Sequence, residues 1–119
     1  MSKLRTEQRR FTRVLLDHPV EVQQGASVWK QNLIDISLSG ASTTQPDIWD
    51  AQYNEPFTLV IDLGGGKELE LHAYLQHVEA RKLGFSVQHV DRENIEPLRA
   101  LLEQHMDLAT LEDELQQLV

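Results

Sequence analysis

Residues 56–78 decide the fold, and they read PFTLVIDLGGGKELELHAYLQHV. In the second half, apolar side chains alternate with polar ones, as in the ELEL of residues 68–71. This is the period of a β-strand with one buried face. The three glycines at 64–66 can adopt the positive φ angles of a hairpin turn. The stretch therefore predicts two antiparallel strands, at 56–63 and 68–78, joined by a short loop.

Similar strand-like patterns occur in most of the chain before residue 90. Runs that alternate or are rich in β-branched residues predict further strands at 19–23, 28–36, 41–44 and 84–90. Six short strands separated by turn residues pack as a small barrel or as a sandwich. We therefore expect a mainly β fold in a single domain.

After residue 90 the apolar period changes from that of a strand to that of a helix. The leucines that set the new period are seven residues apart or lie between such positions: Leu101, Leu108, Leu111, Leu115 and Leu118. The pattern predicts one helix or a pair of helices, with Asn94 as N-cap, Pro97 in the first turn and a break at 105–107. We expect the leucines to cover one mouth or side of the β-structure, with a coiled-coil dimer seam as the alternative.

The composition excludes several classes of function. The chain has 119 residues, no cysteine and a net charge of −8. Disulfides and thiol catalysis are therefore impossible, and a general affinity for DNA, RNA or anionic membranes is not expected. The apolar runs are too short to cross a bilayer, and the first ten residues do not resemble a secretory signal. We expect a cytoplasmic protein without membrane insertion, and a monomer rather than a dimer.

Positive charge is concentrated at the N-terminus. Five of the eleven basic residues of the chain lie within residues 1–13, which contain a single acidic residue, Glu7. This segment is too polar to bury itself, and its arginines repel one another until an anion lies between them. We expect residues 1–14 to be a flexible basic segment that binds a ligand, and residues 15–119 to form the β-domain with its C-terminal helices.

Two short motifs carry the chemistry of the sequence. Residues 9–13 read RRFTR, an RxxxR motif with an additional arginine, and residues 35–40 read DISLSG, a DxSxxG motif. Each motif alone is weak, because Asp-x-Ser followed by Gly is common at strand ends, where side chains bond to turn amides. Their order and spacing are more informative, since 21 residues separate them and the second motif ends a predicted strand.

This combination resembles the PilZ domain family. The resemblance extends to the LGF of residues 83–85, an acidic turn at Asp91 and the leucines of the C-terminal helix, and it covers about residues 9–118. It implies a six-stranded antiparallel β-barrel with helical extensions. It also implies a receptor for cyclic di-GMP that changes conformation on binding to regulate a downstream protein, in motility, pili or biofilm formation.

The resemblance assigns ligand contacts to the charged residues of both motifs. Arg9 and Arg13 would bind the guanine edge and the phosphates, with Arg10 as a further phosphate or stacking partner. Arginine suits these contacts because its planar guanidinium forms bidentate hydrogen bonds and stacks on rings. Asp35 would accept hydrogen bonds from the N1–H and the N2 amine of a guanine. The neutral Gln8 beside the first arginine leaves open whether one ligand or a stacked pair is bound.

Three further residues complete the expected site. Ser37 would contribute a hydroxyl and a turn, and Gly40 would let the backbone approach the ligand closely. His77 could stack on a base, although a lone histidine is more often an ordinary surface residue.

Other functions have little support in the sequence. Gly64–Gly66 and Lys67 do not form a phosphate loop, because the spacing is wrong and a strand follows instead of a helix. The five histidines show no zinc spacing, so no metal or cofactor is expected. Asp35 and Ser37 have no histidine nearby in the sequence to complete a nucleophilic site, so the protein is not expected to be an enzyme. The alternative to a receptor is a module of the same fold that does not bind nucleotide and acts through protein contacts.

Overall fold

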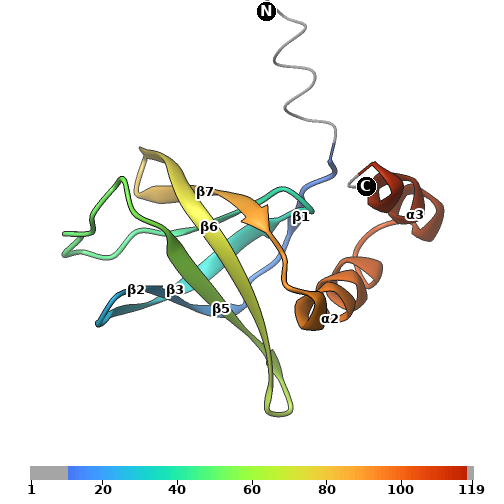
Figure 1. The fold of residues 1–119 in the computed structure, drawn as a ribbon, viewed down its shortest axis with the longest axis horizontal. Coiled ribbons are helices and arrows are strands. Elements are labelled where there is room, and N and C mark those ends of the chain that lie inside the picture. Colours follow the sequence, from blue (N-terminus) through green and yellow to red (C-terminus); the bar gives the residue numbers. More distant parts are fainter. Residues whose placement is uncertain (1–10, 118–119) are drawn as a thin grey trace, which may run out of the picture.

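The computed structural model describes residues 11–117, apart from the side chains of residues 88 and 89. This part of the chain contains seven strands and two helices. The strands are β1 (Val14–Leu15), β2 (Pro19–Gln24), β3 (Ser27–Ile36), β4 (Gly40–Thr44), β5 (Phe57–Gly64), β6 (Lys67–Glu79) and β7 (Lys82–His89). The helices are α2 (Arg92–Glu103) and α3 (Leu108–Gln116). Figure 1 shows the strands as one unit, with both helices together at one side of it.

The strands form a closed antiparallel barrel. The pairing order is β3-β2-β5-β6-β7-β4, and β4 pairs in turn with β3, which closes the ring. The short strand β1 stays outside this ring and pairs with the last residues of β3. The predicted mainly β fold and the six-stranded barrel are therefore confirmed. Closure protects the backbone hydrogen-bonding groups that an open sheet would expose at its edges.

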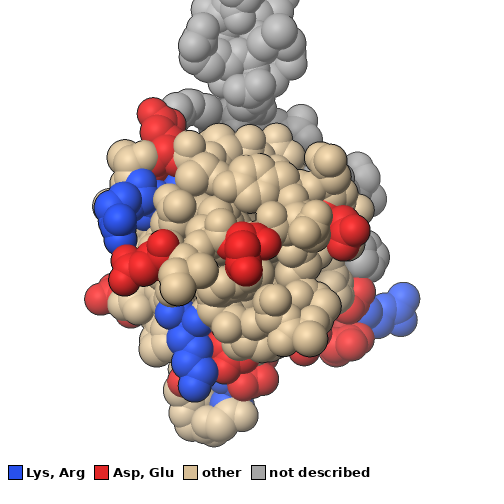
Figure 2. Space-filling view, turned by 90° about the vertical axis from the view of Figure 1, so that its left-hand side faces the viewer, with Lys and Arg blue, Asp and Glu red and all other residues tan. Residues whose placement is uncertain are grey.

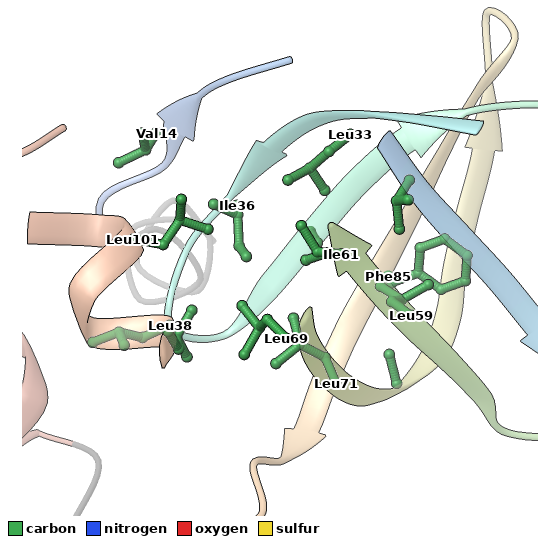
Figure 3. Close-up of a cluster of buried hydrophobic side chains, with 14 of the residues drawn as sticks. Val14, Leu33, Ile36, Leu38, Leu59, Ile61, Leu69, Leu71, Phe85 and Leu101 are labelled. Atoms are coloured by element: carbon green, nitrogen blue, oxygen red, sulfur yellow. The ribbon is translucent and has the colours of Figure 1, made fainter. Parts of the chain in front are cut away.

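The barrel interior is filled by alternate residues of each strand. In β6, Leu69, Leu71 and Ala73 are buried, whereas Glu68 and Glu70 are exposed. Figure 3 shows side chains from the other strands and from α2 meeting these leucines in one cluster. Because the side-chain period of a strand is two, each buried residue leaves its neighbours on the outer face of the barrel. That outer face is the part of the strands available to a ligand.

The turn between β6 and β7 explains an error in the predicted bounds. The strand expected to begin at residue 84 begins at Lys82, because the chain reverses at Ala80 and Arg81, whose φ angles are 53° and 63°. Residues other than glycine rarely adopt this left-handed conformation, so the sequence contained no turn signal here.

Two helices follow the barrel, as the leucine period allowed. They are separated at residues 104–107, close to the expected break, and Leu98, Leu101, Leu102 and Leu111 are buried. Leu108 departs from the expectation, because its side chain is exposed. None of the helices within residues 11–117 is both long enough and apolar enough to cross a membrane.

The start of α2 differs from the prediction. Its N-cap is Asp91, so Asn94 lies in the first helical turn and Pro97 lies farther inside the helix. The expected capping role of Asn94 was wrong because its side chain has another partner. Its Oδ1 accepts a hydrogen bond from the backbone N–H of Glu70 at 2.9 Å, which attaches α2 to β6.

Candidate ligand-binding site

One transverse row of residues crosses four strands on the outer face of the barrel. The register pairs Asp35 of β3 with Ser42 of β4, Ser42 with Gly84 of β7, and Gly84 with His77 of β6. The residues on either side of Ser42 and Gly84 belong to the barrel interior, so alternation directs these two positions outward. Three sequence-predicted regions, around residues 35, 77 and 84, are therefore neighbours in space.

Asp35 is the charged centre of this row. Its side chain is only 8% exposed, and its Oδ1 accepts a hydrogen bond from Arg13 Nη1 at 2.8 Å. Lys82 Nζ lies 3.9 Å from the other carboxylate oxygen. A buried carboxylate requires such partners, because an unpaired charge out of water is costly. The two motifs are thus in direct contact, through the last arginine of one and the aspartate of the other.

The short strand β1 brings Arg13 to this position. Val14 pairs with Ile36 and Leu15 with Asp35, so the residue that precedes β1 lies beside the end of β3. Phe11 is buried in the core cluster, which fixes the chain on the other side of Arg13. The Arg13 side chain itself remains 47% exposed, so its guanidinium is accessible from outside.

The remaining residues of the second motif form a turn between β3 and β4. The backbone N–H of Ser37 donates to the carbonyl of Gly40 at 2.8 Å, and the N–H of Ser39 donates to Ser37 Oγ at 3.1 Å. Ser37 is buried, so in this structure its hydroxyl stabilises the turn that the sequence predicted. Its expected contact with a ligand is not tested here and stays a prediction.

Gly40 is placed where a side chain would not fit. A Cβ at this position would lie 2.7 Å from the carbonyl oxygen of Phe85 on β7 and 3.5 Å from Arg13 Nη2. Gly40 therefore lies directly under the guanidinium of Arg13, and its lack of a side chain allows close packing of β4 against β7.

His77 and Gly84 form the other end of the row. A Cβ at Gly84 would lie 2.6 Å from Cε1 of the His77 ring, so the exposed imidazole lies over the glycine. In the next row, Gly40 pairs with Ser86 and Ser86 with Tyr74, whose ring is partly exposed. The face therefore consists of small residues bordered by the rings of His77 and Tyr74 and by the cations Arg13 and Lys82.

Sequence reasoning missed two residues of this face, Ser42 and Lys82, and it noted Gly84 only within the LGF strand, without assigning it to the site. The alternation around the buried Leu83 already directs Lys82 and Gly84 outward. What the sequence could not provide was the register, which depends on the non-glycine turn at residues 80 and 81.

Arg9 and Arg10 were predicted to bind the ligand, but both lie outside the residues that the structure describes. Of the expected flexible segment, residues 1–14, only residues 11–14 are described, and these contact the barrel and α3. Flexibility of the segment and its ordering by a ligand remain predictions.

Charged side chains of both signs lie on the surface of the described residues (Figure 2). Figure 2 views the end of the barrel opposite to the helices, where acidic side chains lie both near the middle and toward the edge and basic side chains lie toward the edge. Within residues 11–117, His, Asp and Glu side chains do not gather in groups of three that could hold a metal ion.

A closed antiparallel barrel with a polar outer row and an arginine beside it defines a small β-barrel binding module. A family model described as PilZ domain matches residues 7–104, and the chain belongs to this family. The resemblance inferred from the motifs is thereby confirmed. The match includes both motifs and α2 and ends before α3.

Solved structures share the fold at low sequence identity. One is the PilZ domain with c-di-GMP of YcgR from Escherichia coli, with a TM-score of 0.67 and 18% identity over 92% of this chain and 95% of that chain. Another is the inhibitor of motility MotI/DgrA of Bacillus subtilis, with a TM-score of 0.62 and 16% identity over 82% of this chain. The matched region is 53% of the Bacillus protein, so the chain spans about half of its length.

Proposed function

We propose that this protein is a receptor for cyclic di-GMP, which it binds on the outer row of the barrel with the arginines of residues 9–13. The observation that carries this proposal is the contact between Arg13 and Asp35, at 2.8 Å. Residues from two motifs 21 residues apart meet there, beside Gly40, where a side chain would not fit. The fold shared with a PilZ domain that was solved with c-di-GMP supports the choice of ligand.

The ion pair suggests how binding would proceed. Cyclic di-GMP presents two phosphates and two guanines in one compact ring. A phosphate would replace Asp35 as the partner of Arg13, while the N1–H and N2 amine of a guanine would replace Arg13 as donors to Asp35. The buried carboxylate of Asp35 and the half-buried guanidinium of Arg13 would each exchange one partner for another, so neither charge would be left without a hydrogen-bond partner.

The remaining predicted residues have complementary positions in this proposal. Arg9 and Arg10 would add phosphate and stacking contacts, and the His77 ring would stack on the second base or border it. Ser37 would hold the turn, and Gly40 would allow the ligand to approach the backbone. The proposal includes no chemical step and no cofactor, and it places the protein in the cytoplasm as a monomer whose surface changes on binding, to be recognised by a downstream protein.

A second candidate is a PilZ-fold module that acts through protein contacts without nucleotide. The observation in its favour is that Asp35 already has Arg13 as a partner and is largely buried. Under this reading, the pair stabilises the fold and no ligand replaces it.

Calorimetric titration with cyclic di-GMP separates the two candidates. We expect saturable binding by the wild-type protein, with GTP and cyclic GMP as poor competitors because neither presents two guanines and two phosphates. Arg13→Ala should weaken binding by about 2 kcal/mol, or roughly 30-fold, the scale of a truncated charged hydrogen bond.

Arg81→Ala provides the matched control for this titration. Arg81 also pairs with an aspartate, Asp47, at 2.8 Å, but both side chains are strongly exposed in loops. Its replacement should leave the affinity unchanged. If the wild-type protein gives no heat and no NMR shifts with high-micromolar cyclic di-GMP, the receptor proposal is refuted and the interaction module is favoured.

A further inference from the structure

Helix α3 holds the arginine-rich segment through a buried carboxylate. Glu114 is 6% exposed, and its two oxygens accept the backbone N–H of Thr12 at 3.0 and 3.1 Å. Glu114 Oε2 also accepts the Thr12 hydroxyl at 2.6 Å. Thr12 is the residue between Phe11 and Arg13, within the RxxxR motif. The contact joins positions 102 residues apart.

Apolar packing between α3 and the core accompanies the contact of Glu114 with Thr12. Leu111, three residues before Glu114 and on the same side of α3, is fully buried in the cluster that also contains Phe11. The Glu114 carboxylate is itself buried and accepts both donors of Thr12, which restricts its movement. The bond to the amide therefore orients the backbone of Thr12, and with it the direction in which the next residue, Arg13, leaves the chain.

This anchor belongs to a part of the chain beyond the family match, which ends at residue 104, whereas α3 covers Leu108–Gln116. Two other contacts fix the helix: Asp107 accepts the N–H of Thr110 at its N-terminus, and Arg99 of α2 forms an ion pair with Glu112. The contact of Glu114 with Thr12 and the packing of Leu111 in the cluster with Phe11 relate the position of α3 to the motif.

We propose that Glu114 is a positioning residue for the arginine motif, and that it couples the docking of α3 to ligand binding. The inference rests on the proposed function, because it assigns the ligand of the motif to cyclic di-GMP. Energetic coupling is reciprocal, so a helix that holds Arg13 in place is itself held more firmly when a ligand fixes Arg13. Helix α3 is then the element whose stability reports the bound state.

The test compares Glu114→Gln with Asp113→Asn. Both substitutions remove one negative charge from neighbouring positions of α3, but Asp113 is exposed and contacts only Gln117 among the interactions described. A glutamine side chain has only one acceptor oxygen. The backbone N–H and the hydroxyl of Thr12 would therefore lose the pair of carboxylate oxygens to which they donate. Amide hydrogen exchange of the ligand-free proteins and calorimetric titration of cyclic di-GMP are measured for each variant and for the wild type.

In Glu114→Gln we expect faster exchange at the Thr12 amide and an affinity for cyclic di-GMP reduced about fivefold or more. Asp113→Asn should match the wild type in both measurements. In the wild type, cyclic di-GMP should slow hydrogen exchange of the α3 amides. The slowing should be smaller in Glu114→Gln.

The outcomes distinguish this inference from the proposed function. Unchanged Thr12 exchange and unchanged affinity in Glu114→Gln, with normal binding by the wild type, would overturn the positioning role alone. Failure of the wild type to bind would overturn both the receptor proposal and the coupling. If Glu114→Gln does not fold, Glu114→Asp replaces it, because the shorter side chain keeps the charge but withdraws both oxygens from the amide and hydroxyl of Thr12. A wild-type affinity in Glu114→Asp would then count against the coupling.

Discussion

Gly40 and Gly84 lie in the same outer face, but alanine should destabilise the protein at Gly40 and leave its stability nearly unchanged at Gly84. At Gly40, a Cβ would lie 2.7 Å from the backbone oxygen of Phe85, whereas ordinary carbon–oxygen contacts are roughly 3.3 Å or longer. The neighbour is part of a paired strand, so it cannot rotate away. Strands β4 and β7 must therefore separate by about half an ångström.

The cost follows from the bonds beside this position. Val87 N–H of β7 donates to the carbonyl of Ser39, just before β4, at 2.9 Å, so separation strains this bond and the adjoining β4–β7 ladder. Forcing one additional methyl into a packed site costs about 1–3 kcal/mol. At roughly 4 °C per kcal/mol for a domain of this size, Gly40→Ala should lower the melting temperature by about 4–12 °C.

Gly84→Ala is the matched control for Gly40→Ala. Its Cβ would meet the His77 ring, which is the exposed end of a side chain and can turn away. The melting temperature should change by no more than about 2 °C, as for surface substitutions. Affinity for cyclic di-GMP should still decrease, because the ring leaves its place in the row.

Thermal and urea unfolding, followed by titration, provide the measurements for both variants. Gly40→Ala unfolding at the wild-type temperature would refute the argument that a side chain cannot fit between β4 and β7. A large destabilisation by Gly84→Ala would show that His77 is held more firmly than its exposure implies.

Three further substitutions test the roles of individual polar groups. Arg13→Lys keeps the charge but loses the planar fork, so affinity for cyclic di-GMP should decrease about tenfold in calorimetry, while the melting temperature stays close to that of the wild type. Asp35→Asn removes the acceptor charge beside Arg13 and should reduce both affinity and stability, the latter by about 1–3 kcal/mol in urea unfolding; retention of both would exclude a central role for this carboxylate. Asn94→Ala leaves the Glu70 N–H without its side-chain acceptor and should cost about 1–3 kcal/mol of stability without changing affinity, which separates attachment of α2 from ligand binding.

The barrel was predictable because its strands each have one buried face. In residues 56–78 the alternation of leucines and charged residues determined both the strand type and the side that faces the core, and the structure agrees closely. The hairpin needed no long-range information, since three glycines at 64–66 provide the turn with positive φ angles. Local pattern and tertiary packing require the same structure here.

Strand β1 could not be predicted from pattern. It has two residues, too few to show any period, and it exists because Val14 and Leu15 pair with the end of β3. The contact of Thr12 with Glu114 is equally invisible to local reasoning, because an acidic residue on a helix ordinarily faces water. In this chain the motif residues were recognisable from sequence, but the elements that hold them were not.

The described residues of the arginine segment change the expected energetics of binding. If residues 1–14 were all free, ordering each would cost about 1–2 kcal/mol of backbone entropy. Phe11 in the core, Thr12 on Glu114 and Val14 on β3 already restrict the chain on both sides of Arg13. For residues 11–14, about 4–8 kcal/mol of that cost is therefore met during folding and does not reduce ligand affinity. What the ligand must replace at Arg13 is one hydrogen-bonded ion pair with Asp35, so affinity depends on how well a phosphate and a guanine edge reproduce that pair.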